Sequence, residues 1–406
     1  MAAKGGFQIS NLKFQISNMR YRTGGIVCGD AVLRSILKHS AQRLRNFTFY
    51  ILIFDFLICS ASAGAPYPPS PVIEKIAWAP ADTIVRRAAG SDNLPVTWAD
   101  DDALYITWGD GWGFKPKVPK KLSMGFARIV GGPDNFKGIN VRSAAEQLGG
   151  GRSGKKGWGL ISVDGVLYLW MGHADRKGGQ AQLAWSRDHA KTWTFADWKF
   201  PQFGLMGFVN FGKDNKWARD DYVYSYSHNG PLADTPADHF VLMRIPKNRI
   251  TERRAWEFFE RIDKDGKPVW TDEVKRRGAV FRHKDGCLRS AMTYCAPLRR
   301  YLWWQHVPAP RGSRDRGDTR FEGGFGVYDA PEPWGPWTTA FYTEKWDVGP
   351  GEHGDFPAKW MSKDGRELYL VFSGEDSFSV RKATLRLDAG KSEVRNSKSE
   401  TNPKSK

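Results

Sequence analysis

The sequence predicts an all-β protein, a five-bladed β-propeller built from four-stranded antiparallel blades. Its 406 residues include 18 Trp and 43 Gly, and 14% are aromatic, a composition that suits short strands joined by tight turns. An apolar stretch, a polar turn and a strand rich in Leu, Tyr and Trp recur along the chain. The five copies lie at 95–111, 159–173, 208–228, 290–306 and 358–374.

Each copy is typical of a β-hairpin, with Asp-Gly or an equivalent polar turn between its strands. A second strand pair follows each hairpin, so each unit supplies four strands. The copies can be anchored at Leu104, Leu167, Tyr222, Tyr301 and Leu368, which gives spacings of 63, 55, 79 and 67 residues. This is the length of one four-stranded blade, and we expect the propeller to span 64–390.

The longest interval between copies contains one segment with a different period. Within 251–266, Trp256, Phe259 and Ile262 recur at helical spacing. The pattern predicts one short helical insertion outside the blades, with these aromatics used for packing.

The two ends of the chain do not fit the repeat. Phe47 to Cys59 is a 13-residue apolar run that precedes Ala61-Ser62-Ala63, the pattern of a secretory signal cleaved near Ala63. We therefore expect 1–63 to be a signal peptide with a spurious N-terminal extension, and 391–406 to be a disordered tail. The mature protein is expected to be secreted or periplasmic, monomeric and free of the membrane.

The net charge of +17 comes largely from these ends. Residues 1–63 and 391–406 carry 13 of the 61 Lys and Arg but only 4 of the 44 Asp and Glu, which leaves the body at +8. No basic stripe follows a single predicted element, so we expect no nucleic-acid partner.

Two cysteines, Cys287 and Cys295, remain in the expected mature chain. Export permits a disulfide between them. Two free buried thiols are the favoured interpretation, because a strand is expected between the two positions.

Two resemblances to known families rest on short motifs. Ser186 to Trp193 (SRDHAKTW) resembles the Asp-box turn of sialidase-type propellers, with Ala190 in place of Gly. The runs at 91–102, 109–114, 324–338 and 346–362 resemble the secreted bacterial family called domain of unknown function 4185. This family in turn is similar to five-bladed glycoside hydrolases, which implies carbohydrate chemistry without assigning a mechanism.

In a propeller, the ligand face carries the loops that enter each innermost strand and the loops that leave each second strand. Polar residues concentrate at these positions in all five units, where strand ends would also be polar simply because they meet water. The candidates for substrate binding are Asp110, Trp112, His173, His228, Arg289, His306 and Glu375.

Glycoside hydrolysis needs one protonated and one ionised carboxyl group. The catalytic candidates are Asp92, Glu352 and Asp355. Glu352 lies in the Gly-rich run GPGEHGD, where a neighbouring carboxylate can raise its pKa toward that of a general acid. Asp92 is then the general base, and Arg289 clamps the substrate or pairs with one of the acids.

Asp100, Asp101 and Asp102 form the most conspicuous acidic cluster. Alignment of the hairpins places them in a turn on the opposite face, where Asp side chains satisfy backbone donors. The sequence requires no cofactor and assigns no metal ligand, although it leaves a structural or catalytic divalent cation open.

Two functions follow from these candidates. The first is a secreted carbohydrate-active enzyme, a glycoside hydrolase acting on poly- or oligosaccharides. The second is a non-catalytic, lectin-like propeller that binds glycans, because a fold does not fix a function.

Overall fold

The computed structural model describes residues 64–309, 323–349 and 351–388. The expected signal peptide at 1–63 and the expected tail at 391–406 lie outside these ranges. All regular structure in the described ranges is β-strand or three-residue 3-10 helix, so the all-β prediction is confirmed. None of the helices described there is long and apolar enough to span a membrane.

Two antiparallel sheets of four strands follow each other along the chain, with strand orders β3-β4-β5-β6 and β10-β9-β8-β7. The first contains β3 (Val96–Trp98), β4 (Leu104–Trp108), β5 (Gly125–Val130) and β6 (Lys137–Val141). The second contains β7 (Lys156–Val163), β8 (Val166–Gly172), β9 (Gln182–Ser186) and β10 (Thr194–Phe195).

A ten-stranded sheet follows, and it consists of two antiparallel groups. One group contains β11 (Met206–Asn210), β12 (Tyr222–His228), β13 (Ala237–Pro246), β14 (Glu257–Ile262), β15 (Pro268–Thr271) and β16 (Phe281–Cys287). The other contains β17 (Ser290–Cys295), β18 (Arg300–Val307), β19 (Gly324–Ala330) and β20 (Thr338–Thr343). The groups are joined by a short parallel pairing between β11 and β17, in which Val209 faces Met292 and Asn210 faces Thr293.

The last sheet combines strands from both ends of the described chain. Its order is β1-β23-β22-β21, and β2 also pairs with β23. Its strands are β1 (Ile73–Trp78), β2 (Val85–Arg87), β21 (Gly354–Asp355), β22 (Glu367–Phe372) and β23 (Phe378–Leu387). The 3-10 helices η2 to η8 are Ala81–Thr83, Gly151–Ser153, Lys213–Asn215, Lys247–Arg249, Arg253–Ala255, Val274–Arg276 and Ala358–Trp360.

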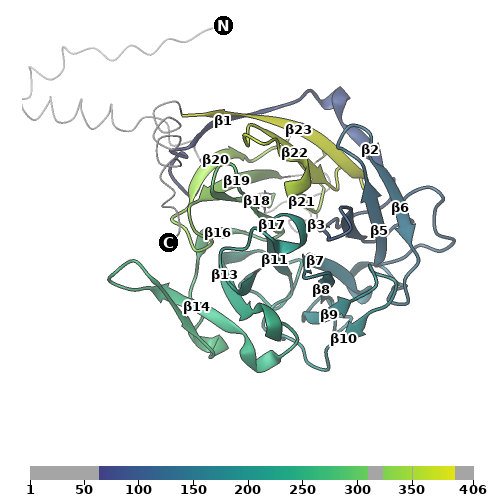
Figure 1. Ribbon diagram of the computed structural model, residues 1–406, viewed down its shortest axis with the longest axis horizontal. Helices are drawn as coiled ribbons and strands as arrows, with labels where there is room; N and C mark the ends of the chain where they lie inside the picture. Colours follow the sequence, from purple (N-terminus) through teal and green to yellow (C-terminus); the bar gives the residue numbers. More distant parts are fainter. Residues whose placement is uncertain (1–63, 310–322, 350, 389–406) are drawn as a thin grey trace, which may run out of the picture. The chain divides into compact units, whose positions relative to one another are not determined.

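The strands β3, β7, β11, β17 and β21 lie nearest the centre of the described part, with their sheets extending outward (Figure 1). Apolar residues fill the spaces between neighbouring strand groups, because central strands such as β8 and β18 are buried on both faces. Each of five large apolar clusters joins one strand group to the next, and one of them joins the first sheet to the last.

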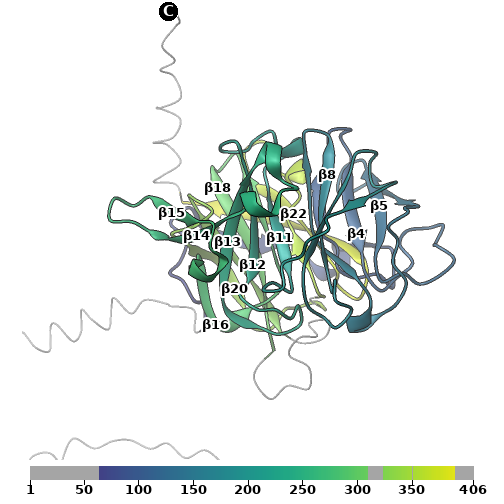
Figure 2. The ribbon, with the colours of Figure 1, turned by 90° about the horizontal axis from the view of Figure 1, so that it is seen from below.

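The helix expected within 251–266 is wrong. Residues Glu257–Ile262 form β14, which pairs with β15 in a hairpin that projects beside β12 and β13 (Figure 2). Trp256 and Phe259 are buried, but Ile262 is 42% exposed, so the three do not share one apolar face. The turn explains the outcome, since Asp263 accepts hydrogen bonds from the backbone of Asp265 and Lys267 at 2.9 and 2.8 Å.

Two local expectations can be compared with the structure. Cys287 and Cys295 are free and buried, as expected, and burial raises the pKa of the Cys295 thiol to about 12. The turn after β9 is held by side chains, because Ser186 and Thr192 donate to Asp188 at 2.8 and 2.6 Å.

Candidate active site

Residues from every strand group meet at one end of the innermost strands, and we call this region the central mouth. Lys156, at the start of β7, forms an ion pair with Asp110, which follows β4. Arg289 precedes β17 and contacts two carboxylates, Asp234 at 3.0 Å and Glu352 at 3.4 Å. Four of these residues, Asp110, Lys156, Arg289 and Asp234, come from four different strand groups, and Glu352 comes from the last sheet.

Asp92 lies beside this network at the start of the first sheet. Its backbone pairs with Gly109 in an isolated bridge, and its Oδ1 accepts a hydrogen bond from Asn93 Nδ2 at 3.0 Å. A Cβ on residue 109 would lie 2.4 Å from Asp92 Oδ1, so the close approach requires glycine.

Burial is the largest cause of the strongly raised pKa of Asp92. The negative charges of Glu352 and Asp110 raise the pKa further, whereas the positive charges of Lys156 and Arg289 oppose the shift. Burial and the neighbouring carboxylates therefore favour the protonated form of Asp92.

Glu352 differs from Asp92 because a guanidinium lies against it. Its side chain is 14% exposed, and Arg289 Nη1 lies 3.4 Å from its Oε1. Its backbone N–H donates to Ser373 Oγ at 2.7 Å, which fixes the loop before β21. The Arg289 guanidinium itself lies 5.5 Å from the Trp158 ring centroid, which restricts its position. Glu352, the acid expected from the sequence, thus lies beside a fixed positive charge.

Asp355, the third catalytic candidate, lies inside β21 rather than at the mouth. Its Oδ1 accepts a hydrogen bond from Thr293 Oγ1 on β17 at 3.0 Å. Burial raises the pKa of Asp355 to about 7, while hydrogen bonds from Thr293, Val96 and Phe356 oppose the shift. These contacts tie β21 to its neighbours, so the structure places Asp355 in a supporting position.

The three predicted histidines are buried in separate surroundings. His173 Nδ1 is 3.0 Å from the Gly154 carbonyl oxygen, and its Nε2 is 4.0 Å from Asp234 Oδ2. His228 Nε2 is 2.9 Å from the Leu232 carbonyl oxygen, and burial lowers its pKa to about 4. Burial also lowers the pKa of His306 well below its ordinary value.

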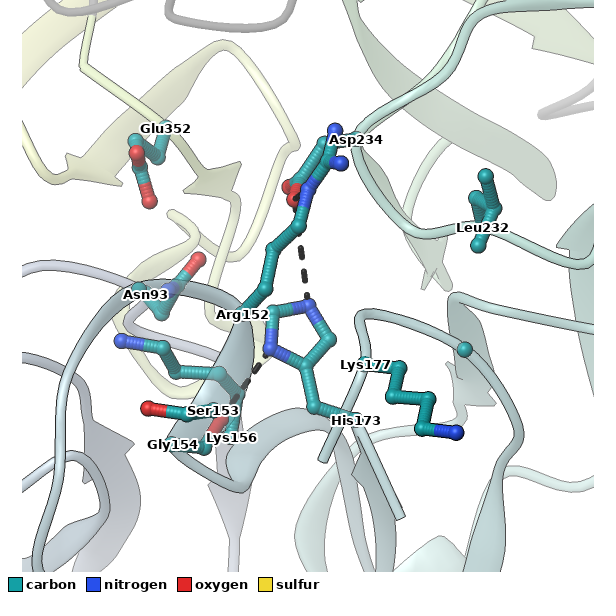
Figure 3. Close-up of polar contacts among 12 residues, drawn as sticks. Asn93, Arg152, Ser153, Gly154, Lys156, His173, Lys177, Leu232, Asp234 and Glu352 are labelled. Atoms are coloured by element: carbon teal, nitrogen blue, oxygen red, sulfur yellow. Dashed lines mark hydrogen bonds and ion pairs between the residues drawn. The ribbon is translucent and has the colours of Figure 1, made fainter. Parts of the chain in front are cut away.

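Burial thus favours the neutral form of all three histidines. Figure 3 shows His173, Lys156, Arg152, Asp234 and Glu352 around one space. Within the described ranges, these histidines do not form a cluster of metal-ligand geometry; the cluster found there is Asp100, Asp101 and His189.

That acidic cluster lies in the turn between β3 and β4. Asp101 accepts hydrogen bonds from the Ala103 backbone, Tyr105 and Arg128 at 2.9 to 3.1 Å. Asp100 Oδ1 lies 2.9 Å from His189 Nε2. These partners satisfy the carboxylates as turn residues do, which agrees with the role expected from the sequence.

Two predicted binding residues have other neighbours. Lys117 and Lys121 lie over the Trp112 ring at 5.3 and 5.5 Å from its centroid. Glu375 is exposed and pairs with Arg86 at 3.0 Å. The structure therefore does not place Trp112 or Glu375 in the ion-pair network of the mouth.

Sequence reasoning missed Asp234, a residue of the network. Asp234 lies in the loop between β12 and β13, where Arg289 and Arg152 approach it at 3.0 and 3.5 Å. This loop leaves a second strand, so it belongs to the class of loops in which binding residues were expected from the sequence. Asp234 was missed because it follows the strand end at His228 by six positions.

Comparisons with known proteins give distant structural likenesses. No family model matches the sequence, and no curated protein matches it, so the resemblance to domain of unknown function 4185 stays a prediction. The chain is similar to a GH43_1 enzyme from Xanthomonas citri complexed with xylose, at 14% identity and TM-score 0.41, covering 75% of this chain and 90% of that one.

Two further solved structures are similar to this chain. One is the catalytic domain of a GH62 α-L-arabinofuranosidase from Coprinopsis cinerea, at 10% identity and TM-score 0.42, covering 79% of this chain and 96% of that one. The other is a GH43 β-xylosidase/α-arabinofuranosidase from a compost microbial metagenome in complex with xylotriose, at 12% identity and TM-score 0.40, covering 75% and 98%. The function is therefore argued from the site.

Proposed function

We propose that the protein is a secreted five-bladed β-propeller whose central mouth hydrolyses glycosidic bonds in poly- or oligosaccharides. The cyclic order of the five apolar clusters supports five blades, because each cluster joins one strand group to the next and the last sheet to the first. In this arrangement, the short parallel pairing of β11 with β17 is the place where the third and fourth blades contact each other near the propeller axis.

One observation carries the catalytic proposal: two neighbouring carboxyl groups of the mouth have contrasting surroundings. Asp92 is buried with a strongly raised pKa, whereas Glu352 lies against Arg289. Hydrolysis of a glycoside needs this combination, one carboxyl that gives a proton to the leaving oxygen and one carboxylate that activates water or attacks the sugar. We assign Asp92 as the proton donor and Glu352 as the carboxylate.

The remaining charges of the mouth position these two groups. Arg289 bridges Glu352 and Asp234, so its guanidinium fixes the carboxylate from one side. Lys156 is buried and pairs with Asp110, and its positive charge limits the rise in the pKa of Asp92. A proton leaving Asp92 during the reaction would therefore form a carboxylate near a fixed ammonium group.

The alternative function is a lectin-like mouth that binds glycans without cleaving them. The bridge from Arg289 to two carboxylates favours it, because a carboxylate engaged by a guanidinium is less available to water or sugar. Neutral, buried His173 and His228 also suit hydrogen bonding to sugar hydroxyls.

Replacement of Asp92 by Asn tests the proposal. Asp92→Asn removes the proton while keeping the shape, and we expect reducing-sugar release from an oligosaccharide panel to fall about 100- to 10,000-fold. Asp164→Asn is the matched control, because this 73% exposed residue lies in the turn between β7 and β8. Glycan binding without cleavage by the wild-type protein would favour the lectin-like function.

A further inference from the structure

Two adjoining cavities lie at the outer part of the first sheet, away from the ion pairs of the mouth. Their volumes are about 600 and 430 Å³. They share Lys115, Lys117, Lys137 and Gly138 in their walls. We call them together the basic groove, which is formed by residues 86–89, 113–118, 136–140 and 142.

The walls of the basic groove carry positive charge and no carboxylate. Two of the cations are offset by neighbouring acids, since Arg86 pairs with Glu375 at 3.0 Å and Arg142 pairs with Glu146 at 2.7 Å. The other four form no ion pair with any described residue; they are Arg87, Lys115, Lys117 and Lys137. All four residues are exposed. Lys117 Nζ donates to the Ala89 carbonyl oxygen at 3.3 Å, which places its charge at the groove wall.

The floor of the groove is fixed by aromatic packing. Phe114 and Phe136 are buried, and their ring centroids lie 5.6 and 5.2 Å from that of Phe378 on β23. A Cβ on residue 138 would lie 2.3 Å from the Phe114 ring, so Gly138 allows β6 to approach the floor closely. The cations therefore project from a rigid seam between the first and last sheets.

The groove is connected to the mouth through one loop. The loop begins at Asp110, which pairs with Lys156 in the mouth, and it continues through the groove residues 113–118. The Gly113 backbone N–H donates to Ser91 Oγ at 3.1 Å, and Ser91 directly precedes Asp92. The loop and this hydrogen bond therefore connect the wall of the groove to the segment that carries the proposed proton donor.

We propose that the basic groove binds an acidic polysaccharide, a glycan whose repeating carboxylate or sulfate groups meet Arg87, Lys115, Lys117 and Lys137. The proposal rests on the proposed carbohydrate function of the mouth. Cations without a carboxylate partner along a groove suit a ligand with repeating negative charges, and the mouth, which residues 110–118 connect to the groove, suits a sugar. The groove then holds an acidic polysaccharide outside the cleavage position.

Titration calorimetry at low salt on the full chain tests this site with defined probes. The probes are polygalacturonate for carboxylates, chondroitin sulfate for sulfates, unsubstituted xylan as the neutral glycan, and duplex DNA and phosphatidylserine vesicles as other polyanions. The groove variant combines Lys115→Ala, Lys117→Ala and Lys137→Ala. The matched control combines Lys264→Ala, Lys267→Ala and Lys275→Ala, three exposed lysines of another strand group.

We expect the wild-type protein to bind at least one acidic polysaccharide and to bind xylan at least tenfold more weakly. The groove variant should lose about tenfold or more in affinity, since three exposed charge pairs are removed, and the control should change less than about twofold. Equal losses in both triple variants, equal binding of xylan, or tighter binding of DNA or vesicles would overturn the proposal.

The same measurement separates this proposal from that of the mouth. Asp92→Asn leaves the groove intact, so it should bind the acidic probe as the wild type does even where hydrolysis is lost. Unchanged acidic-glycan binding in the groove variant would overturn the groove while leaving hydrolysis untouched. Absence of hydrolysis by the wild type, with groove-dependent binding retained, would overturn only the function of the mouth.

Discussion

Asp92 and Asp355 are both buried aspartates at innermost strands, but different neighbours surround them. Asp92 interacts with the charges of Glu352, Lys156, Asp110 and Arg289, which belong to the mouth. Asp355 is surrounded by neutral donors, and burial is the main cause of its raised pKa. Sequence position predicted both as catalytic, but it cannot distinguish a carboxyl facing charged groups from one that ties strands together.

This difference predicts a pH-dependent stability effect at Asp355. Its pKa is about 7 in the folded protein and close to its ordinary value of 3.8 when unfolded. Between these values the folded state binds more protons, so the contribution of Asp355 to the free energy of unfolding decreases as pH rises from about 4 to 7. Relative to wild type, Asp355→Asn should therefore gain stability over this range, by up to about 4 kcal/mol.

Urea unfolding of both proteins at pH 4, 5, 6 and 7 measures this effect. The comparison must be made between variants, because His228 has a pKa lowered to about 4 and loses stability as pH falls below its unfolded value of 6.5. That slope is common to wild type and Asp355→Asn and cancels in the difference. If the stability difference between wild type and Asp355→Asn did not change with pH, Asp355 would have the same pKa in the folded and unfolded states.

At the scale of elements, hairpins were predictable because their turns are encoded locally. Asp164-Gly165, for example, joins β7 and β8, and both residues have positive φ. The segment 251–266 failed because its apolar spacing fits a helix, whereas the turn at Asp263 and the pairing of β14 with β15 determine the structure. Pairing between distant strands, such as β1 with β23, has no local signal.

The pairing of β1 with β23 predicts where the fold is sensitive to substitution near its N-terminal side. Ile76 lies opposite Leu385 and is buried among Leu368, Leu370 and other apolar residues. Ile76→Ala should lower the free energy of unfolding by about 2 to 5 kcal/mol, as for other buried truncations. Lys75→Ala, next to it on the exposed face, should change it by less than about 0.5 kcal/mol.

Thermal unfolding followed by circular dichroism measures both variants. Ile76→Ala weakens the packing of the sheet that joins the two ends of the described chain, so its unfolding midpoint should be lower than that of the wild type. The transition should remain cooperative. Similar midpoints for the two variants would mean that β1 contributes little to closing the last sheet.

At the scale of the whole molecule, sorting polar residues by strand end predicted that Asp92, Asp110, Arg289 and Glu352 would share one region, and the structure brings them together. It worked because the ends of innermost strands converge once neighbouring sheets pack side by side. It failed for Asp234, which reaches the network from within a longer loop whose path the sequence does not specify. The direction of the pKa shift of Asp92 depends on burial and on partners distant in sequence, so it could not be predicted without the structure.

The contacts of Tyr67 are compatible with the cleavage site that the sequence predicts. Tyr67 packs on Phe281 at 4.7 Å between ring centroids, and its hydroxyl accepts a hydrogen bond from the Arg282 backbone at 2.8 Å. Cleavage after Ala63, at the small-residue pattern that follows the apolar run, would retain these contacts. We therefore expect the exported protein to begin at or near Gly64.

Mass spectrometry and N-terminal sequencing of protein from the culture medium or periplasm measure this start. Ala63→Leu should block cleavage and leave a longer, cell-associated product, whereas a wild-type product that begins well before residue 60 would contradict the signal assignment.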